Sequence, residues 1–323
     1  MTLTDTLISL RKANLPAMVF GPPGTGKSAA AKEAAQGDPI IDLRLSMLDT
    51  LDMRGMPMPS KDSNDVMWSR PDFLPREGKG ILLLDEINTA NPSIQNAALQ
   101  LVLDRRCGPH TLPEGWWVMA AGNYSTDKAA VNPIPAPLLN RFVVLKHEPN
   151  LKDWSKWAIQ NNIHEDVLGF LNFRESMLYQ PPSDVEYNNF PTPRSWASIS
   201  KLIHNNIQEQ NVFEGTVGIG ATIEFLSYQA AKKDLPDLDA LIENGCDSLS
   251  HIKNTVAYAV SVGLALRVAK NPKLMDKATK VASHLSPELT ALYISLVIAN
   301  NVVVAISNST IAEWIKNHKH LLI

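Results

Sequence analysis

A glycine-rich octapeptide is the part of this sequence whose residue types and spacing most clearly predict chemistry. It lies between an apolar run, Pro16–Phe20, and an alanine-rich segment, Ala29–Ala35, an order that predicts a strand, a loop and a helix. Glycines let backbone N–H groups turn around an anion, and the first N–H groups of the helix add to the same positive field. The residues expected to bind the phosphates of a nucleoside triphosphate are Gly21, Pro22, Pro23, Gly24, Thr25, Gly26, Lys27, Ser28 and Ala29.

Two side chains of this loop have separate expected roles. Lys27 is expected to reach the β- and γ-phosphates, and the hydroxyl of Ser28 is expected to bind Mg²⁺. Both roles require a second element that brings acidic groups to the same place.

That second element is an apolar run, Ile81–Leu84, which ends in Asp85 and Glu86. Such a run is typical of a central parallel strand, and ligands bind at the carboxyl ends of parallel strands. We expect Asp85 to hold Mg²⁺ through a water and Glu86 to polarise an attacking water. The alternative is that both acids cap the helix that follows.

The adjacent Asp85 and Glu86 also help to distinguish an ATPase from a kinase or a GTPase. A P-loop kinase brings an acceptor to the γ-phosphate and needs no water-activating acid here, whereas hydrolysis by water does. The chain contains no Asn-Lys-x-Asp motif of the kind with which GTPases read their base. The pattern therefore predicts hydrolysis of ATP.

Composition places the chain among ordinary globular proteins. Of its 323 residues 45% are hydrophobic and 20% charged, and the formal net charge of −3 gives no support to bulk binding of nucleic acid or anionic membrane. Cys107 and Cys246 stand far apart without a metal-binding spacing, and the N-terminus lacks the layout of a signal peptide. We therefore expect a reduced, cytoplasmic protein.

The elements that must position these residues change type along the chain. Strand-like and helical runs alternate up to about residue 150, which predicts an α/β fold with a parallel sheet and helices on both faces. Helix-length segments follow: Trp154–Asn161, Asp166–Tyr179, Arg194–Asn206, Val217–Lys232, Ile252–Ala269, Pro287–Ala299 and Thr310–His318. The expected strands are Pro16–Phe20, Pro39–Leu45, Gly80–Asp85, Trp116–Ala121 and Phe142–Lys146.

One late stretch, Leu289–Ile306, is apolar enough to be compared with a membrane span. Asn300 and Asn301 lie within it, and two adjacent amides are costly in hydrocarbon. We therefore expect a buried helix and no membrane partner.

Three further motifs follow in a fixed order. Trp117–Asn123 is a strand that ends in an amide, Leu138–Phe142 places an arginine before the last strand, and Pro191–Trp196 opens a helix. With the two elements above, they resemble the AAA+ ATPases, specifically the MoxR-like and dynein-related branch. Segments that resemble insertions of this branch are Asp49–Pro57 with Trp68–Pro75, around the second helix, and Arg105–Trp116, a β-hairpin.

The resemblance implies roles for three residues outside the loop and the acids. Asn123 matches sensor 1 and would position the water, from a strand between those of the P-loop and of Asp85. Arg141 matches the arginine finger that reaches the γ-phosphate bound by a neighbouring subunit, and Arg194 matches sensor 2. A second arginine could also act on the nucleotide of a neighbouring subunit, and the candidates for this second trans arginine are Arg70, Arg105 and Arg106. The residues before Asn123 read Ala-Ala-Gly, where MoxR proteins proper usually have Ala-Thr-Gln.

The resemblance also implies an architecture and a role. It predicts an AAA+ α/β domain over residues 1–149 and a helical lid over 150–235, with a helical extension over 236–323 that matches nothing known to us. It implies a homo-oligomeric ring of six subunits that uses ATP and Mg²⁺ to remodel a protein client, with a von Willebrand factor A domain protein as a partner. One alternative is a nucleic-acid-dependent motor, such as a restriction-type translocase or helicase loader, suggested by Lys61 and Arg70 in the first insertion and by Arg105 and Arg106 near the hairpin. The other is a slow nucleotide-dependent assembly switch.

Overall fold

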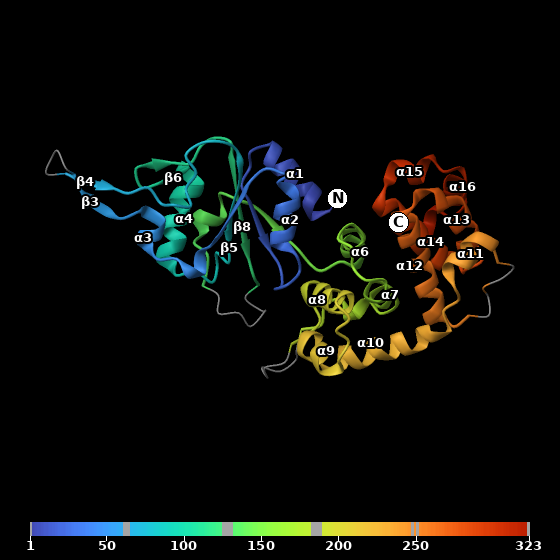
Figure 1. The fold of residues 1–323 in the computed structure, drawn as a ribbon. Coiled ribbons are helices and arrows are strands. Elements are labelled where there is room, and N and C mark those ends of the chain that lie inside the picture. The colour runs from blue at the N-terminus through green and yellow to red at the C-terminus, as the bar shows by residue number, and fades with distance from the viewer. Residues whose placement is uncertain are drawn as a thin grey trace. The chain divides into compact units, whose positions relative to one another are not determined.

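A computed structural model of the chain describes residues 2–60, 65–124, 132–181, 189–246, 249 and 252–321. These form two compact units, Met1–Glu148 and Pro149–Ile323 (Figure 1). The sequence predicted a change from alternating strands and helices to helices alone near Pro149. Lys61, which was named above as support for a nucleic-acid-dependent motor, lies outside the described residues.

The first unit is built on a five-stranded sheet whose strands are ordered β2-β5-β8-β1-β9. All pairs within this sheet are parallel, with Leu83 opposite Met119 and Met119 opposite Ala17. The α/β fold with a parallel sheet is therefore confirmed, and so is the place of β8 between β5 and β1. The strands are β1 (Ala17–Phe20), β2 (Ile40–Arg44), β5 (Gly80–Asp85), β8 (Trp116–Gly122) and β9 (Val143–Lys146).

Side chains of the central strands alternate between two cores, one on each face of the sheet. Leu82 and Leu84 belong to the core that α4 covers, whereas Ile81 and Leu83 belong to the core that α1 and α2 cover. Helices on both faces explain why the run that precedes Asp85 is apolar without interruption. The helices of this unit are α1 (Leu3–Lys12), α2 (Lys27–Ala34), η1 (Leu45–Met47), α3 (Thr50–Arg54), α4 (Pro92–Asp104) and α5 (Ala136–Leu139).

Two antiparallel hairpins extend from the first unit. The longer pairs β3 (Pro57–Pro59) with β4 (Val66–Trp68), and it projects from the α3 side of the sheet (Figure 1). The shorter pairs β6 (Arg106–Cys107) with β7 (His110–Thr111) directly after α4. The hairpin predicted within Arg105–Trp116 is thus present, and the first predicted insertion consists of α3 and the longer hairpin.

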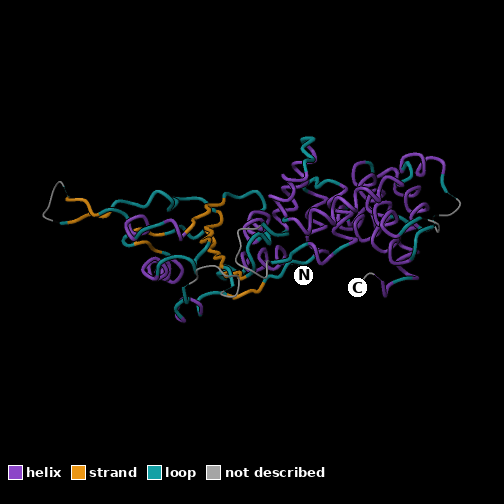
Figure 2. The backbone as a smooth tube through the Cα atoms, turned by 90° about the horizontal axis from the view of Figure 1, so that it is seen from below, coloured by secondary structure: helices purple, strands orange, loops and turns teal. Residues whose placement is uncertain are grey.

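The described residues of the second unit form helices and the loops that join them, without strands (Figure 2). One hydrophobic core runs through it from Leu151 to Ile311, so the predicted lid and extension share their packing. The elements are α6 (Leu151–Gln160), α7 (Glu165–Phe173), η3 (Glu175–Met177), α8 (Pro193–His204), α9 (Gln210–Val217), α10 (Ile219–Ala231), η4 (Lys232–Asp234), α11 (Leu238–Asn244), α12 (Asn254–Lys270), η5 (Pro272–Leu274), α13 (Met275–Ala282), α14 (Pro287–Asn300), α15 (Val302–Ser307), α16 (Ser309–Asn317) and η6 (Lys319–Leu321).

Two predicted helices are divided in the structure, and a third, predicted over 217–232, begins two residues later at Ile219. α7 ends at Phe173, because Arg174, with φ of −131° and ψ of 71°, leaves the helical region, and η3 follows it. The indole N–H of Trp196 donates to the Met177 carbonyl at 2.7 Å, a contact that local sequence does not reveal. Gly218, with φ of 85°, separates α9 from α10. Asn301 adopts an extended conformation and divides the expected helix over 289–306 into α14 and α15. Among the described residues, no helix is both long and apolar enough to cross a membrane.

Candidate functional site

The glycine-rich loop joins the end of β1 to the start of α2, as the sequence predicted. Gly24 and Gly26 have φ of 74° and 98°, a region that a residue with a Cβ rarely adopts. The hydroxyl of Thr25 donates to the Pro22 carbonyl at 2.8 Å and closes the loop on itself. The helix begins at Lys27, so its first N–H groups face into the loop.

Lys27 is the buried cation of this loop, with only 9% of its surface exposed. Its ammonium group donates to the carbonyls of Gly21 at 2.7 Å and Pro22 at 2.9 Å, and to Oδ1 of Asn123 at 3.0 Å. The loop and the end of β8 therefore converge on one positive charge. An anionic phosphate that enters the loop would meet this charge directly.

Ser28 and Asp85 lie together on the neighbouring side of the loop. The Ser28 hydroxyl donates to Oδ2 of Asp85 at 2.9 Å, although the two residues are far apart in the chain. A hydroxyl and a carboxylate are the hard oxygen donors that Mg²⁺ prefers. The donor set therefore fits the predicted cation.

Partial burial raises the pKa of Asp42, and the negative charge of Asp85 raises it further. Asp42 lies on β2, the strand that pairs with β5. Two carboxylates close to each other make this edge of the sheet electronegative. A divalent cation next to Asp85 would relieve their repulsion.

Glu86 follows Asp85 with φ of 56°, which is uncommon for a residue with a side chain. Its N–H bonds to Oδ1 of Asp85 at 2.9 Å, and its carbonyl accepts from the Thr89 hydroxyl at 2.8 Å. Its carboxylate accepts a hydrogen bond of 2.5 Å from the hydroxyl of Ser46. The left-handed turn thus directs Glu86 away from the strand axis.

The alternative role of the two acids as helix caps is wrong. The next helix, α4, begins at Pro92, and its cap is Asn91, whose side chain accepts from the N–H of Ser93. Asp85 and Glu86 lie at the end of β5, and a turn separates them from α4. The cap of α4 therefore does not account for their position.

Asn123 lies directly after β8. Its side chain accepts from Lys27, while its backbone is held on both sides by Asn88. The sequence analysis did not single out Asn88 or Ser46. A small polar residue after a strand is too common to be recognised without the tertiary contact.

His147 is a third residue that the sequence analysis did not place in the site. Its ring Nε2 lies 3.0 Å from the Thr25 carbonyl, and its backbone N–H extends the pairing of β9 with β1 to Phe20. A Cβ at Gly21 would overlap the His147 carbonyl, so that position requires glycine. The end of β9 therefore supports the loop from outside.

Arg141 lies just after α5, and its side chain is exposed. Its guanidinium makes no hydrogen bond or ion pair with any residue that the structure describes. Arg194 lies in the first turn of α8 and is exposed as well. Arg194 belongs to the second unit, and its role as sensor 2 stays a prediction.

Two of the three other arginines have structural roles. Arg105 donates to the carbonyls of Pro113 at 2.7 Å and Trp116 at 2.6 Å and so closes the short hairpin at its base. Arg70 donates to the carbonyls of Leu74 and Thr111 at 3.2 and 3.1 Å. Arg106 is exposed and has no such bond to a described residue. Of the candidates for a second trans arginine, Arg106 is therefore the one whose guanidinium has no hydrogen bond or ion pair to the described part of its own chain.

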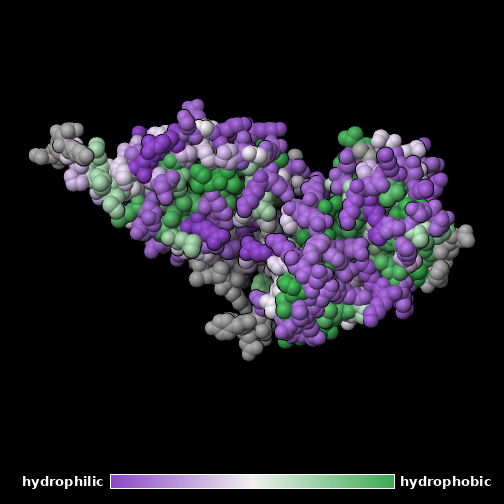
Figure 3. All heavy atoms as spheres, viewed as in Figure 1, coloured by the Kyte–Doolittle hydropathy of each residue, from purple (hydrophilic) through white to green (hydrophobic). Residues whose placement is uncertain are grey.

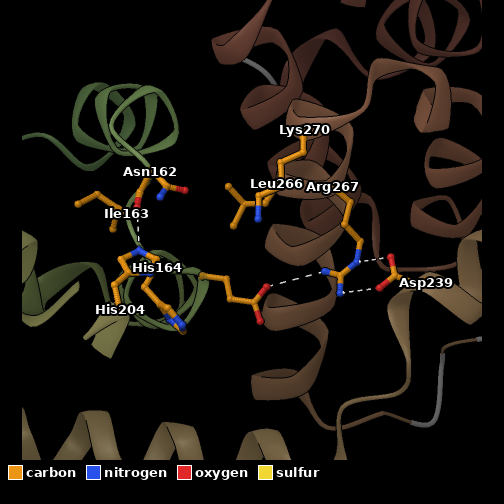
Figure 4. A pocket seen from close by; sticks show the side chains of 9 residues that line it. Asn162, Ile163, His164, His204, Asp239, Leu266, Arg267 and Lys270 are labelled. Atoms are coloured by element: carbon orange, nitrogen blue, oxygen red, sulfur yellow. Dashed lines mark hydrogen bonds and ion pairs between the residues drawn. The ribbon is translucent and has the colours of Figure 1, made fainter. Parts of the chain in front are cut away.

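A separate cavity of about 420 Å³ lies within the second unit (Figure 4). Its wall includes His164, His204 and Arg267, and Arg267 is paired with Asp239 at 2.8 Å. None of the residues predicted to bind or hydrolyse a nucleotide lines this cavity.

No protein-family model and no curated protein matches the chain. Among solved structures, NtrX from Brucella abortus in complex with ADP is similar at a TM-score of 0.42 and 13% identity, over 100% of this chain and 69% of that one. A variant of RuvB from Thermotoga maritima is similar at a TM-score of 0.42 and 16% identity, over 82% of each chain. The assignment of the site therefore depends on its own residues and geometry.

Proposed function

We propose that this protein hydrolyses ATP. The observation that carries the proposal is the convergence of three strand ends: β1 leads into the glycine-rich loop, β5 ends at Asp85 and Glu86, and β8 ends at Asn123. These strands are neighbours in the sheet, so their carboxyl ends meet at one edge. The bonds from Lys27 to Asn123 and from Ser28 to Asp85 join the three ends.

In the proposed reaction, Lys27 and the loop amides bind the phosphates. Ser28 and Asp85 would hold Mg²⁺, which when bound neutralises charge on the phosphate oxygens. Glu86 accepts a proton from water while the water oxygen bonds to the γ-phosphorus and the bond from that phosphorus to the bridging oxygen breaks. Asn123 orients the water, and the products are ADP and inorganic phosphate.

We propose that the active form is a ring, a hexamer by its resemblance to the AAA+ ATPases. Arg141 would complete the site of a neighbouring copy and stabilise charge in the transition state. Its exposed guanidinium, without a partner among the described residues of its own chain, supports this role. Because the site would be completed across an interface, hydrolysis would depend on assembly.

We further propose that the ring remodels a protein client, in the manner of the MoxR-like branch. The longer hairpin supports a protein partner, because its exposed side chains are apolar: Met58 is 50%, Val66 60% and Met67 58% exposed (Figure 3). Methionine adapts to varied surfaces, as a remodelling protein requires. A von Willebrand factor A domain protein is the partner that the resemblance suggests.

Nucleic acid is not the partner we propose. Two of the four cations that suggested this alternative, Arg70 and Arg105, donate to carbonyls of their own chain. The described residues of the longer hairpin strands include no lysine or arginine. The described strands of the longer hairpin therefore offer no positive charge to the phosphates of a nucleic acid.

The test is the steady-state ATPase activity of the wild type, Glu86→Gln and Arg141→Ala, measured across protein concentration with and without DNA. We expect specific activity to rise with concentration and both variants to bind ATP without hydrolysing it. DNA should have no effect. Full activity of Glu86→Gln would show that Glu86 is not the general base. Activity independent of both concentration and Arg141 would exclude the shared site, and strong stimulation by DNA would favour the motor on nucleic acid.

A further inference from the structure

Asn88 holds the backbone of Asn123 with both ends of its carboxamide. Its Nδ2 donates to the Asn123 carbonyl at 2.6 Å, and its Oδ1 accepts from the Asn123 N–H at 3.1 Å. The two residues lie 35 positions apart, at the ends of the adjacent strands β5 and β8. One side chain therefore satisfies both backbone groups of the residue predicted to orient water.

The environment of Asn88 makes this arrangement specific. Asn88 is only 4% exposed, so an unsatisfied amide or carbonyl there would lose hydrogen bonds that water cannot replace. The adjacent Gly122 leaves room for the carboxamide, because a Cβ at Gly122 would lie 2.9 Å from Oδ1 of Asn88. Among the common side chains, only an amide supplies a donor and an acceptor side by side at this length.

Asn88 also connects Asn123 to the rest of the site. It follows Glu86 by one intervening residue, and its own carbonyl accepts from the N–H of Asn132 at 2.6 Å. Asn88 holds the backbone of Asn123, and the side chain of Asn123 accepts from Lys27 at 3.0 Å. The turn that carries Glu86 and the residue that contacts Lys27 are thus tied to each other through Asn88.

We propose that Asn88 is a positioning residue that sets the distance between Glu86 and Asn123, so that one water contacts both. The inference rests on the proposed hydrolysis of ATP and identifies a determinant of its rate. Asn88 does not touch the nucleotide in this role. It acts through the backbone of Asn123, and its loss should therefore lower kcat and leave the binding of ATP unchanged.

Two variants test the two halves of the contact. Asn88→Asp keeps the acceptor for the Asn123 N–H but sets a carboxylate oxygen against the Asn123 carbonyl, and Asn88→Leu removes both hydrogen bonds at similar volume. We expect both to lower kcat by about 10- to 100-fold, the range for a small displacement of a reacting group. The Kd for ATP, measured with a fluorescent analogue, should match that of the wild type.

Gln95→Leu is the matched control. Gln95 is a fully buried amide on α4 whose Nε2 bonds to Ala90 at 3.3 Å, and it has no hydrogen bond to Asn123. Both leucine variants remove a buried amide from the same unit, but only Asn88→Leu releases Asn123. The control should keep its kcat. Equal losses in kcat and in melting temperature for Gln95→Leu and Asn88→Leu would mean that Asn88 is only structural.

A double variant separates positioning from general destabilisation. If Asn88 acts only by holding the Asn123 backbone so that the Asn123 side chain is in place, its loss should have no effect once that side chain is removed. Asn88→Leu combined with Asn123→Ala should then have the same kcat as Asn123→Ala alone. A multiplicative loss would show that Asn88 affects the reaction by another route and would overturn the inference.

The two proposals fail in different ways. If Glu86→Gln and Asn123→Ala leave hydrolysis unchanged, or the wild type does not hydrolyse ATP, the proposed function is wrong and the inference falls with it. If those variants are inactive while Asn88→Leu and Asn88→Asp have normal kcat, only the positioning role of Asn88 is wrong.

Discussion

The hydroxyl of Ser46 donates a hydrogen bond of 2.5 Å to the carboxylate of Glu86. Ser46 follows β2 and Glu86 follows β5, and these strands are paired in the sheet. The carboxylate that would accept a proton from water therefore has a hydrogen-bond donor within its own chain. A hydrogen bond of this kind competes with water for the base.

Replacement of Ser46 by alanine should therefore raise the basal ATPase rate. A hydrogen bond to a charged group contributes about 1.5–3 kcal/mol, which limits the increase to about 10- to 100-fold. The measurement is kcat at saturating ATP, with Kd for ATP as the reference value. Ser46→Thr keeps the hydroxyl and should behave as the wild type. A fall in kcat for Ser46→Ala would mean that Ser46 supports the active position of Glu86.

Replacement of Asp85 by asparagine should abolish the stabilisation that ATP with Mg²⁺ confers. Asparagine keeps an acceptor for the Ser28 hydroxyl, so the hydrogen bond of 2.9 Å can persist without the charge that a cation needs. A ligand that binds at 100 times its Kd raises stability by about 2.7 kcal/mol, an effect that thermal unfolding detects.

In the absence of nucleotide, Asp85→Asn should melt at or above the temperature of the wild type. The negative charge of Asp85 contributes to the raised pKa of Asp42, so its removal relieves a repulsion. Asp42→Asn relieves the same repulsion and should keep the response to ATP with Mg²⁺. A response to the metal that survives in Asp85→Asn would exclude Asp85 from the cation site.

Two helical glycines of the second unit should respond in opposite directions to alanine. A Cβ at Gly169 would overlap the hydroxyl of the buried Tyr228, whereas a Cβ at Gly215 would meet no atom within 4 Å. Gly169→Ala should therefore cost about 1–3 kcal/mol through overpacking. Gly215→Ala should stabilise by up to about 1 kcal/mol through helix propensity. Chemical denaturation of the full chain measures both, and equal effects would contradict the packing of α7 against α10.

The stability of the second unit should fall as the pH decreases below 6.5. Burial lowers the pKa of His164 from its ordinary value of 6.5, against the opposing charges of Asp166 and Glu165. A histidine whose pKa is depressed in the folded state binds a proton more readily when unfolded. Its contribution to stability is therefore complete above 6.5 and is lost as the pH falls toward the folded pKa.

His164 also caps α7, because its Nδ1 accepts from the N–H of Asp166 at 3.2 Å. His164→Asn keeps a capping side chain without the titration, so its melting temperature should vary less between pH 7 and 5. Burial works to raise the pKa of Asp166, but Lys232, together with Gln229 and His164, outweighs burial and lowers that pKa from its ordinary value. Asp166 therefore loses its contribution only at lower pH. An unchanged slope in His164→Asn would assign the pH dependence to other groups.

The sequence determined the parallel sheet, its strand ends and the glycine-rich loop between β1 and α2. These features depend on local patterns: an apolar run of Ile81–Leu84 needs cover on both faces, and Gly24 and Gly26 adopt angles that other residues avoid. The places of Lys27, Ser28, Asp85, Glu86 and Asn123 followed from the order of these elements along the chain.

Only the tertiary structure determined which residues complete the site. Asn88, Ser46 and His147 are ordinary polar residues after strands, and they reach the site through contacts between segments 35, 40 and 122 positions apart. Local sequence likewise did not show that Arg70 and Arg105 would donate to carbonyls of their own chain. A hydrogen bond between distant segments exists only when packing brings donor and acceptor together, and no short stretch of sequence carries that information.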